Sequence, residues 1–311
     1  MNAITRLNTL FLSTLLLSGL LATEAFAADG RFEETFAVSE PIVLDASTGS
    51  GSIKIRSGSD DEVTVVGEIQ VRRRFGWGKP RNGDEIVQQL LDNPPIEMGG
   101  GRLRVGHISD RGLRNSVSIS YEIVVPTGTE IIAESGSGSI TVTDVAAPVD
   151  AVAGSGSLVL ENIGGPTEAR TGSGSIRAEG IAGSFKGKSG SGRIRLEQTA
   201  PGDVVVSTGS GSSNLNGVAG SLSASSGSGR ITVDGRQEGD WTLDTGSGSI
   251  RVSLPEDAAF DLDAESRSGR IDIEHPLTVE GQMSKRHVTG TVRGGGPKLE
   301  IETGSGKIRV N

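Results

Sequence analysis

The sequence predicts an all-β protein, a parallel and right-handed β-solenoid (β-helix) with about 18 residues and two strands in each coil. Three observations favour this fold class. A glycine-serine motif recurs at a nearly constant interval, the residues around it alternate in polarity as strands do, and only 3% of residues are aromatic although 34% are hydrophobic. A flattened coil has room mainly for aliphatic side chains between its two sheets, so a low aromatic content suits this fold.

The motif, Gly-Ser-Gly or close to it, sets the length of one coil. From Gly136 to Gly246 its first glycine recurs every 18 or 19 residues. The first glycines are Gly49, Gly136, Gly154, Gly172, Gly190, Gly209, Gly227, Gly246 and Gly304, and Arg267 takes this place in a tenth copy. A more degenerate copy begins at Gly99. A fixed period of this length is typical of a solenoid, whose coils bury their inner faces only by stacking.

Each motif is predicted to be a corner between two strands. Trp241, Leu243 and Thr245 share one face before the corner at Gly246, and Ile250 and Val252 share a face after it. The inward-facing residues are thus odd-numbered before the motif and even-numbered after it. A strand keeps strict alternation unless a bulge or bend inserts a residue. Glycine permits the positive φ and the close backbone approach that such a bend needs.

The central serine of each corner is predicted to have a structural role. Parity places it on the inward side, together with the Ser or Thr that precedes the first glycine. Stacked coils would then align these hydroxyls into hydrogen-bonded ladders. A functional serine array is the alternative, but buried hydroxyls generally serve to satisfy polar groups. The central serines are Ser50, Ser137, Ser155, Ser173, Ser191, Ser210, Ser228, Ser247, Ser268 and Ser305.

Residues 1–27 are predicted to be a cleaved signal peptide. Arg6 precedes an apolar run at residues 10–22, and Ala25-Phe26-Ala27 gives the small-x-small pattern of a secretory cleavage site. The protein is therefore expected to be exported, to the periplasm or to the cell surface and beyond. An uncleaved anchor is the alternative, for which the apolar run is short. Without cysteine, the chain has neither disulfides nor a lipid-modified cysteine, and no second apolar stretch is long enough to span a membrane.

Residues 28–311 are expected to form one solenoid domain that two irregular segments interrupt. In the first, residues 72–95, a short helix is predicted from Asp84 to the stop at Pro94-Pro95. This helix would cap the amino-terminal end of the solenoid, because open strand edges need covering. A binding loop built on the basic and aromatic residues at 72–77 is the alternative. The second segment, residues 276–297, is predicted to be an irregular hairpin.

The charged residues predict two outer faces of opposite sign. Outward positions before the corners are mostly acidic, as at Asp244 and Glu300, and those after the corners are mostly basic. The simpler interpretation is two solvated faces that keep the protein soluble. The sharper hypothesis is a basic surface that binds an anionic polysaccharide, a protein or the acidic face of a second copy. Its residues are Lys54, Arg177, Arg193, Arg195, Arg230, Arg251, Arg270, Lys307 and Arg309. The net charge of −9 argues against nucleic acid as a partner.

The motifs of common active sites are missing from the sequence. The corner lacks the Gly-Lys-Ser/Thr ending of a phosphate loop, and no G-x-S-x-G elbow is present. Ile or Leu stands where calcium-binding solenoids carry aspartate. We therefore expect no catalytic residues, no metal site and no cofactor.

Three stretches make the chain resemble the bacterial "putative adhesin" family of exported, repeat-built proteins, whose function is formally unknown. These are the recurrent TGSGSI corners, YEIVVPTGTEIIAESGSGSI at 121–140 and LPEDAAFDLDAESRSGRIDI at 254–273. The resemblance spans nearly all of the chain after residue 27. It implies a parallel β-solenoid in a cell-envelope setting, and it supplies no catalytic residues.

The expected function is that of a non-enzymatic envelope or surface protein, a binding scaffold with flat charged faces that acts in adhesion or envelope stress. Two alternatives stay open. A polysaccharide-active β-helix enzyme would need clustered outward carboxylates beside a groove. An ice-binding or crystal-binding protein would need outward threonine ladders, to which only Thr141 and Thr143 come close.

Overall fold

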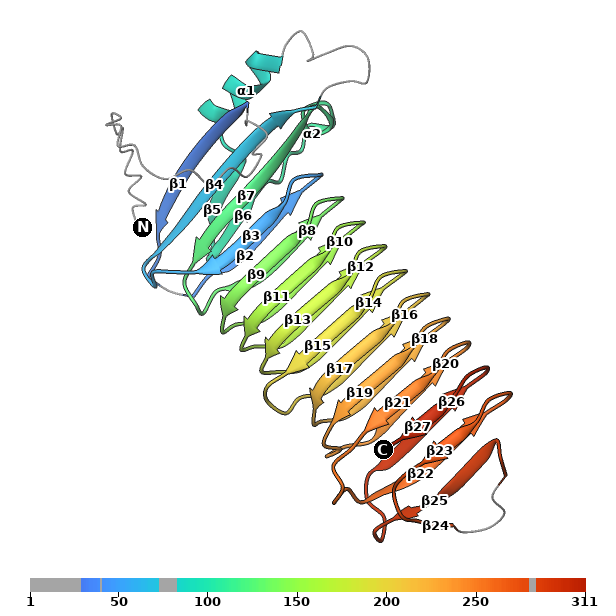
Figure 1. The fold of residues 1–311 in the computed structure, drawn as a ribbon. Helices are drawn as coiled ribbons and strands as arrows, with labels where there is room; N and C mark the ends of the chain where they lie inside the picture. The colour runs from blue at the N-terminus through green and yellow to red at the C-terminus, as the bar shows by residue number, and fades with distance from the viewer. Residues whose placement is uncertain (1–28, 40, 73–82, 280–283) are drawn as a thin grey trace, which may run out of the picture.

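A computed structural model describes residues 29–39, 41–72, 83–279 and 284–311. The predicted signal peptide and most of the basic and aromatic stretch at 72–77 lie outside these residues. Over the described part the chain forms an elongated stack of coils (Figure 1) whose strands pair mainly in parallel. The predicted all-β solenoid is therefore confirmed.

Each regular coil contributes one strand to each of two facing sheets. The regular coils consist of β8 (Glu130–Ser135) and β9 (Ile140–Val145), β10 (Val149–Ala153) and β11 (Leu158–Ile163), β12 (Thr167–Thr171) and β13 (Ile176–Ile181), β14 (Phe185–Ser189) and β15 (Ile194–Gln198), β16 (Val204–Thr208) and β17 (Ser213–Val218), β18 (Leu222–Ser226) and β19 (Ile231–Gly235), and β20 (Trp241–Thr245) and β21 (Ile250–Ser253). We call the sheet that contains β9 and its copies sheet A, and the sheet that contains β8 and its copies sheet B. Val149 pairs with Thr167 and Phe185 with Val204, so partners lie one sequence period apart, as predicted.

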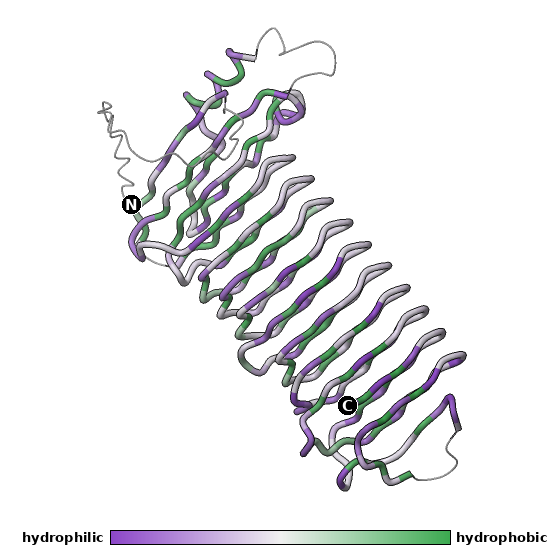
Figure 2. The backbone as a smooth tube through the Cα atoms, viewed as in Figure 1, coloured by the Kyte–Doolittle hydropathy of each residue, from purple (hydrophilic) through white to green (hydrophobic). Residues whose placement is uncertain are grey.

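The hydrophobic core is a thin layer between the two sheets. Burial alternates along the strands, so that Trp241, Leu243 and Thr245 of β20 are buried while the two residues between them are exposed. Figure 2 shows hydrophobic residues recurring in coil after coil along the stack. Trp241, Tyr121, Phe185 and Phe260 are the largest of the fully buried side chains. The inward sets that alternation predicts on both sides of the corner at Gly246 are confirmed.

The corner glycines are needed because the coils stack so closely. A Cβ atom on Gly174 would lie closer than 3.0 Å to the carbonyl oxygen of Gly156 in the preceding coil, and Gly156 stands in the same relation to Gly138. None of the ten corners contains a residue with positive φ, so that part of the prediction is wrong. Positive φ occurs instead at the opposite bend, at Asp144, Asn162, Gly180 and Gly217. Close backbone approach, rather than left-handed geometry, therefore selects glycine in the corner.

A ladder of buried hydroxyls runs along the corners, one residue before the first glycine. Thr171 donates to the carbonyl of Gly156 in the preceding coil at 2.9 Å and accepts from the N–H of Gly174 at 3.1 Å. Ser189 repeats this pattern one coil further on, with the Gly174 carbonyl at 2.9 Å and the Gly192 N–H at 2.8 Å. Each such hydroxyl satisfies backbone groups that the bend removes from the regular sheet pairing.

The prediction that the central serines point inward is wrong. Nine of the ten, all of which lie in described segments, are exposed, and Ser50 is half-buried. The strand before the corner ends at the Ser or Thr that precedes the first glycine, as β12 does at Thr171, and the next strand starts only at Ile176. Because the central serine belongs to neither strand, the alternation rule does not apply to it. Of the hydroxyls predicted to face inward, only those of the Ser or Thr that precedes the first glycine form the buried ladder.

Replacing Thr171 with valine is expected to lower the free energy of unfolding by about 1–2 kcal/mol, because the Gly174 N–H loses its buried acceptor. The matched control is Ser173→Ala in the same corner, where the exposed side chain should change stability by less than about 0.5 kcal/mol. Urea unfolding followed by circular dichroism measures both. Equal losses in the two variants would contradict the assignment of the ladder to the residue before the glycine.

At the amino-terminal end the chain departs from the order of the coils. The coil of β2 (Val43–Thr48) and β3 (Ile53–Ser57) stacks directly on β8 and β9. Beyond it lie β6 (Arg102–Val105), β7 (Val117–Val125) and the antiparallel strands β1 (Gly30–Ala37), β4 (Glu62–Val71) and β5 (Ile96–Gly99). The predicted helix is α1 (Gly83–Asp92), which packs against β1 and β4 and so lies at the end of the stack (Figure 1). A second helix, α2 (Arg111–Ser116), precedes β7 and was not predicted.

The degenerate corner expected at Gly99 is a different structure. It is the turn between β5 and β6, which pair antiparallel, and Gly100 and Gly101 adopt positive φ there. A glycine run alone does not distinguish a solenoid corner from a hairpin turn, since glycine suits both.

At the carboxy-terminal end one coil is inserted out of sequence. The coil of β26 (Lys298–Thr303) and β27 (Ile308–Val310) lies between the coil of β20 and β21 and the coil of β22 (Phe260–Ser266) and β23 (Ile271–Ile273). The chain thus leaves a slot one coil wide, builds the outer coil first and returns to fill the slot. On the way it forms β24 (Leu277–Val279) and β25 (His287–Val292), which pair antiparallel in the segment predicted to be a hairpin.

Candidate functional site

All nine cations of the predicted basic surface lie along sheet A. Lys54, Arg177, Arg195, Arg251 and Arg309 point outward from β3, β13, β15, β21 and β27, and the other four directly precede strands of the same sheet. The structure does not bring all nine together. Lys54 lies near the amino-terminal end and Arg177, Arg193 and Arg195 in the middle, whereas Arg230, Arg251, Arg270, Lys307 and Arg309 gather over the last coils.

Three of the nine cations, which lie outside the last coils, form ion pairs with two neighbouring carboxylates. Lys54 Nζ lies 2.9 Å from Glu122, and Arg177 and Arg195 lie 2.7 Å and 3.6 Å from Glu179. The hydrogen bond from Lys54 lowers the pKa of Glu122, so this carboxylate stays ionised at neutral pH. Exposed pairs of this kind add little to stability. They do reduce the charge that these coils offer to a ligand.

Four of the other six cations, Arg230, Arg251, Lys307 and Arg309, line a shallow hollow at the carboxy-terminal end of sheet A, which we call the basic hollow. It has a volume of about 320 Å³ and is lined by Arg230, Ser249, Ile250, Arg251, Lys307 and Arg309. Arg251 and Arg309 are direct partners on the adjacent parallel strands β21 and β27. Parallel neighbours lie about 4.8 Å apart, so two guanidinium groups emerge side by side. The out-of-sequence coil is what places Arg309 next to Arg251.

The charge of the basic hollow is only partly balanced. Lys307 lies 2.5 Å from Asp272, and Arg309 lies 4.0 Å from Asp272 and 3.9 Å from Glu274. The hydrogen bond from Lys307 lowers the pKa of Asp272. Arg230 donates through Nε to Ser249 at 3.1 Å. Among the described residues, no carboxylate lies within 4.0 Å of Arg230 or Arg251, whereas Asp272 and Glu274 accompany Lys307 and Arg309. The hollow therefore carries excess positive charge on a chain whose net charge is −9.

Sheet B is less uniformly acidic than predicted. Over the last coils Asp244, Glu302 and Glu265 do form a row across the adjacent strands β20, β26 and β22. In the middle of the sheet, however, Arg170 of β12 and Lys186 of β14 stand among the outward residues, where both contact Glu168. The prediction of two faces of opposite sign therefore holds only near the carboxy-terminal end.

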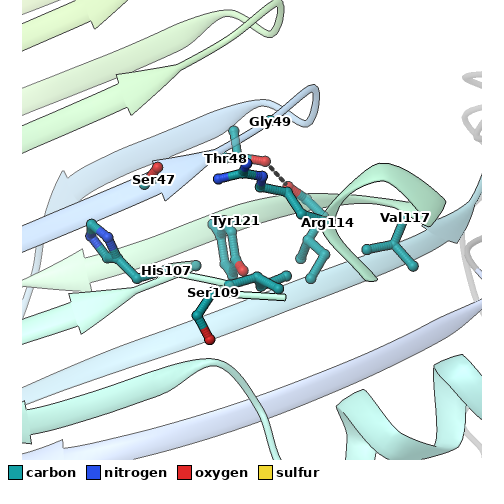
Figure 3. A pocket seen from close by; sticks show the side chains of 11 residues that line it. Ser47, Thr48, Gly49, His107, Ser109, Arg114, Val117 and Tyr121 are labelled. Carbon is teal, nitrogen blue, oxygen red and sulfur yellow. Dashed lines mark hydrogen bonds between the residues drawn. The ribbon is translucent and has the colours of Figure 1, made fainter. Parts of the chain in front are cut away.

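A second hollow, which we call the cap pocket, lies where the first coil meets the amino-terminal cap (Figure 3), and sequence reasoning missed it. Its volume is about 510 Å³. The end of β2, the segment after β6, α2 and β7 meet here, and the lining residues are Ser47, Thr48, Gly49, Gly106, His107, Ile108, Ser109, Arg114, Val117, Ile119 and Tyr121. The only signal in the sequence is Tyr121, the single tyrosine of the chain, in an alternating strand.

Within the described segments no group of three or more His, Cys, Asp or Glu side chains is placed to hold a metal ion. None of the helices that the structure describes has the length and apolar character to cross a membrane.

Comparison with solved structures finds chains of similar extent. A protein from Clostridium sporogenes described as a "putative cell adhesion protein" is 14% identical, with 90% of this chain and 99% of that chain covered and a TM-score of 0.23. A "putative lipid binding protein" from Parabacteroides distasonis is 14% identical, with 90% and 96% covered and a TM-score of 0.46. A "putative adhesin" from Bacteroides fragilis is 10% identical, with 91% and 97% covered and a TM-score of 0.36. At these TM-scores the similarities support no inference about function.

No curated protein matches the chain. A family model does, and it covers residues 39–311, which include every coil of the solenoid and all of the amino-terminal cap except β1. The chain therefore belongs to the Toastrack DUF4097 family.

Proposed function

We propose that this protein is an exported, non-enzymatic binding scaffold of the cell envelope that holds an acidic polysaccharide against the basic hollow. The observation that carries the proposal is the pair of adjacent guanidinium groups, Arg251 and Arg309, beside Arg230 and Lys307 on an otherwise acidic chain. The predicted signal peptide at 1–27 supports the envelope setting. The family resemblance points the same way.

The chemistry of the hollow suits carboxylate groups on a flexible polymer. Guanidinium groups recognise carboxylates through two parallel hydrogen bonds, and Arg251 and Arg309 bring two such groups to the hollow. The hollow is open to solvent, so attraction depends on salt and falls as the ionic strength rises. A long flat sheet allows the polymer to continue past the hollow along sheet A, and weak contacts then add up along its length.

The lining of the hollow also bears on the enzyme alternative. Hydrolysis of a glycosidic bond requires two suitably placed carboxyl groups. The lining consists of four cations, a serine and an isoleucine, and the nearby Asp272 is held by Lys307. This set favours holding an anion over cleaving a sugar chain.

The double variant Arg230→Gln/Arg251→Gln is expected to weaken binding to polygalacturonate by at least about tenfold, because it removes the two cations of the hollow that have no close carboxylate among the described residues. Isothermal titration calorimetry measures the affinity and its salt dependence. Salt concentrations of about 20 mM and about 300 mM span the range over which the screening length changes strongly.

The matched control is Lys54→Gln/Arg177→Gln, which removes the same charge from cations already paired with Glu122 and Glu179. It should leave the affinity nearly unchanged. If both double variants bind polygalacturonate as the unmodified protein does, the proposal is wrong. If instead reversal of Asp244, Glu302 and Glu265 abolishes a concentration-dependent association seen in sedimentation, the partner is a second copy.

A further inference from the structure

The cap pocket combines an apolar floor with a cation at its rim. Ile108, Val117 and Ile119 line it together with the ring of Tyr121, and Val117, Ile119 and Tyr121 belong to the hydrophobic core. These side chains come from β7, which pairs with β3 and β4, and from the segment that follows β6. A volume of about 510 Å³ falls in the usual range for small-molecule sites.

The Tyr121 hydroxyl is buried in the wall of the pocket without a hydrogen-bond partner among the described residues. A Cβ on Gly106 would lie 3.0 Å from this oxygen, and Gly106 itself has φ of +81°, so the backbone turns tightly over the ring. Burial raises the pKa of Tyr121, so the hydroxyl stays a proton donor at neutral pH. A buried donor left unpaired costs about 1–3 kcal/mol. Native proteins usually satisfy such a group with ordered water or a ligand.

Arg114 supplies the charge at the rim. Its side chain extends from α2 across the pocket toward Thr48 (Figure 3). The Thr48 hydroxyl is already used, because it donates to the Ile119 carbonyl at 2.7 Å and accepts from the Gly51 N–H. His107, on the other side, is engaged with Asp45 at 2.9 Å. Within the described segments Arg114 forms no ion pair, so its guanidinium is available to a ligand.

We propose that the cap pocket binds a small amphipathic organic anion, whose acid group pairs with Arg114 and whose apolar body packs on Ile108, Val117 and the Tyr121 ring. An oxygen of the ligand, directly or through one water, accepts from the Tyr121 hydroxyl. This site is separate from the basic hollow, which lies at the other end of the solenoid. The two proposals therefore stand or fall independently.

The single tyrosine makes the test direct. Uniform labelling with 3-fluorotyrosine places one fluorine reporter in the chain, at Tyr121. Titration of the full protein with sodium octanoate should shift the ¹⁹F resonance in a saturable manner. Octanol, which lacks the acid, and acetate, which lacks the apolar body, should each require at least about tenfold higher concentration for the same shift.

Arg114→Gln is expected to weaken octanoate binding by at least about tenfold. Arg111→Gln is the matched control, since Arg111 is an exposed cation on the same helix that does not line the pocket. Circular dichroism checks that both variants fold. The proposal is overturned if octanoate leaves the resonance unshifted, if octanol binds as tightly as octanoate, or if Arg114→Gln binds octanoate as Arg111→Gln does.

Discussion

Replacing Trp241 with alanine is expected to lower the free energy of unfolding by about 3–5 kcal/mol, the range found when large core aromatics are truncated. Trp241 is fully buried in β20, between Leu222 of β18 and Leu299 of β26. Its indole Nε1 also donates to the Gly220 carbonyl at 2.9 Å. Because Leu299 belongs to the out-of-sequence coil, the cavity would loosen the contact that holds this coil in its slot. Urea unfolding followed by circular dichroism measures the loss.

Two further variants separate the causes of this loss. Trp241→Phe keeps most of the volume but removes the donor to Gly220, and a loss of about 1–2 kcal/mol is expected from the unpaired carbonyl. Val205→Ala, at an exposed apolar position of β16 that is 45% accessible, should change stability by less than about 0.5 kcal/mol. A Trp241→Ala variant that unfolds at the same urea concentration as Val205→Ala would contradict the assigned core position.

Gly174→Ala is expected to destabilise the solenoid by about 3 kcal/mol, at the upper end of the usual cost of overpacking. The added Cβ would collide with the carbonyl oxygen of Gly156, which is a backbone atom and cannot rotate away. Relief therefore requires the two coils to separate, which breaks the hydrogen bond from Thr171 to Gly156 and disturbs the adjoining pairing of β11 with β13. Thermal unfolding and amide hydrogen exchange both report the effect, and exchange should increase most in these neighbouring coils.

The matched control is Gly128→Ala. Gly128 is exposed, has no positive φ, and nothing lies within 4 Å of the position that a Cβ would occupy. This substitution should be neutral or slightly stabilising, because alanine restricts the unfolded chain more than glycine does. Equal destabilisation by the two substitutions would show that chain flexibility, and not the contact between coils, is what the glycines provide.

The regular coils could be predicted because their evidence is local and repeated. Alternation within a strand fixes which side chains face inward, and the constant period fixes which strand pairs with which, as for Phe185 with Val204. The alternation rule fails inside the corner, where Ser173 belongs to no strand. The glycines were identified correctly, but their backbone conformation depends on the neighbouring coil and is not visible in one repeat.

The order of the coils at the two ends could not be predicted. Nothing in the strands of residues 260–273 or 298–310 indicates which of them lies next to β20, since both carry the same inward pattern and the same type of corner. That order decides the site, because it makes Arg309 the neighbour of Arg251 and brings Asp272 to Lys307. The cap pocket was missed for a similar reason. Its walls come from separate segments of the chain that contain no recurring motif.

The insertion of residues 298–310 between two earlier coils has a consequence for the length of the molecule. A coil added after residue 310 would have no free slot to enter, whereas a coil added between the regular coils that lie between β8 and β18 would meet the same parallel partners on both sides as every regular coil does. Each such addition would lengthen the stack by about 4.8 Å without altering either end. The regular coils thus act as a spacer of adjustable length, which sets the distance between the cap pocket and the basic hollow in fixed increments.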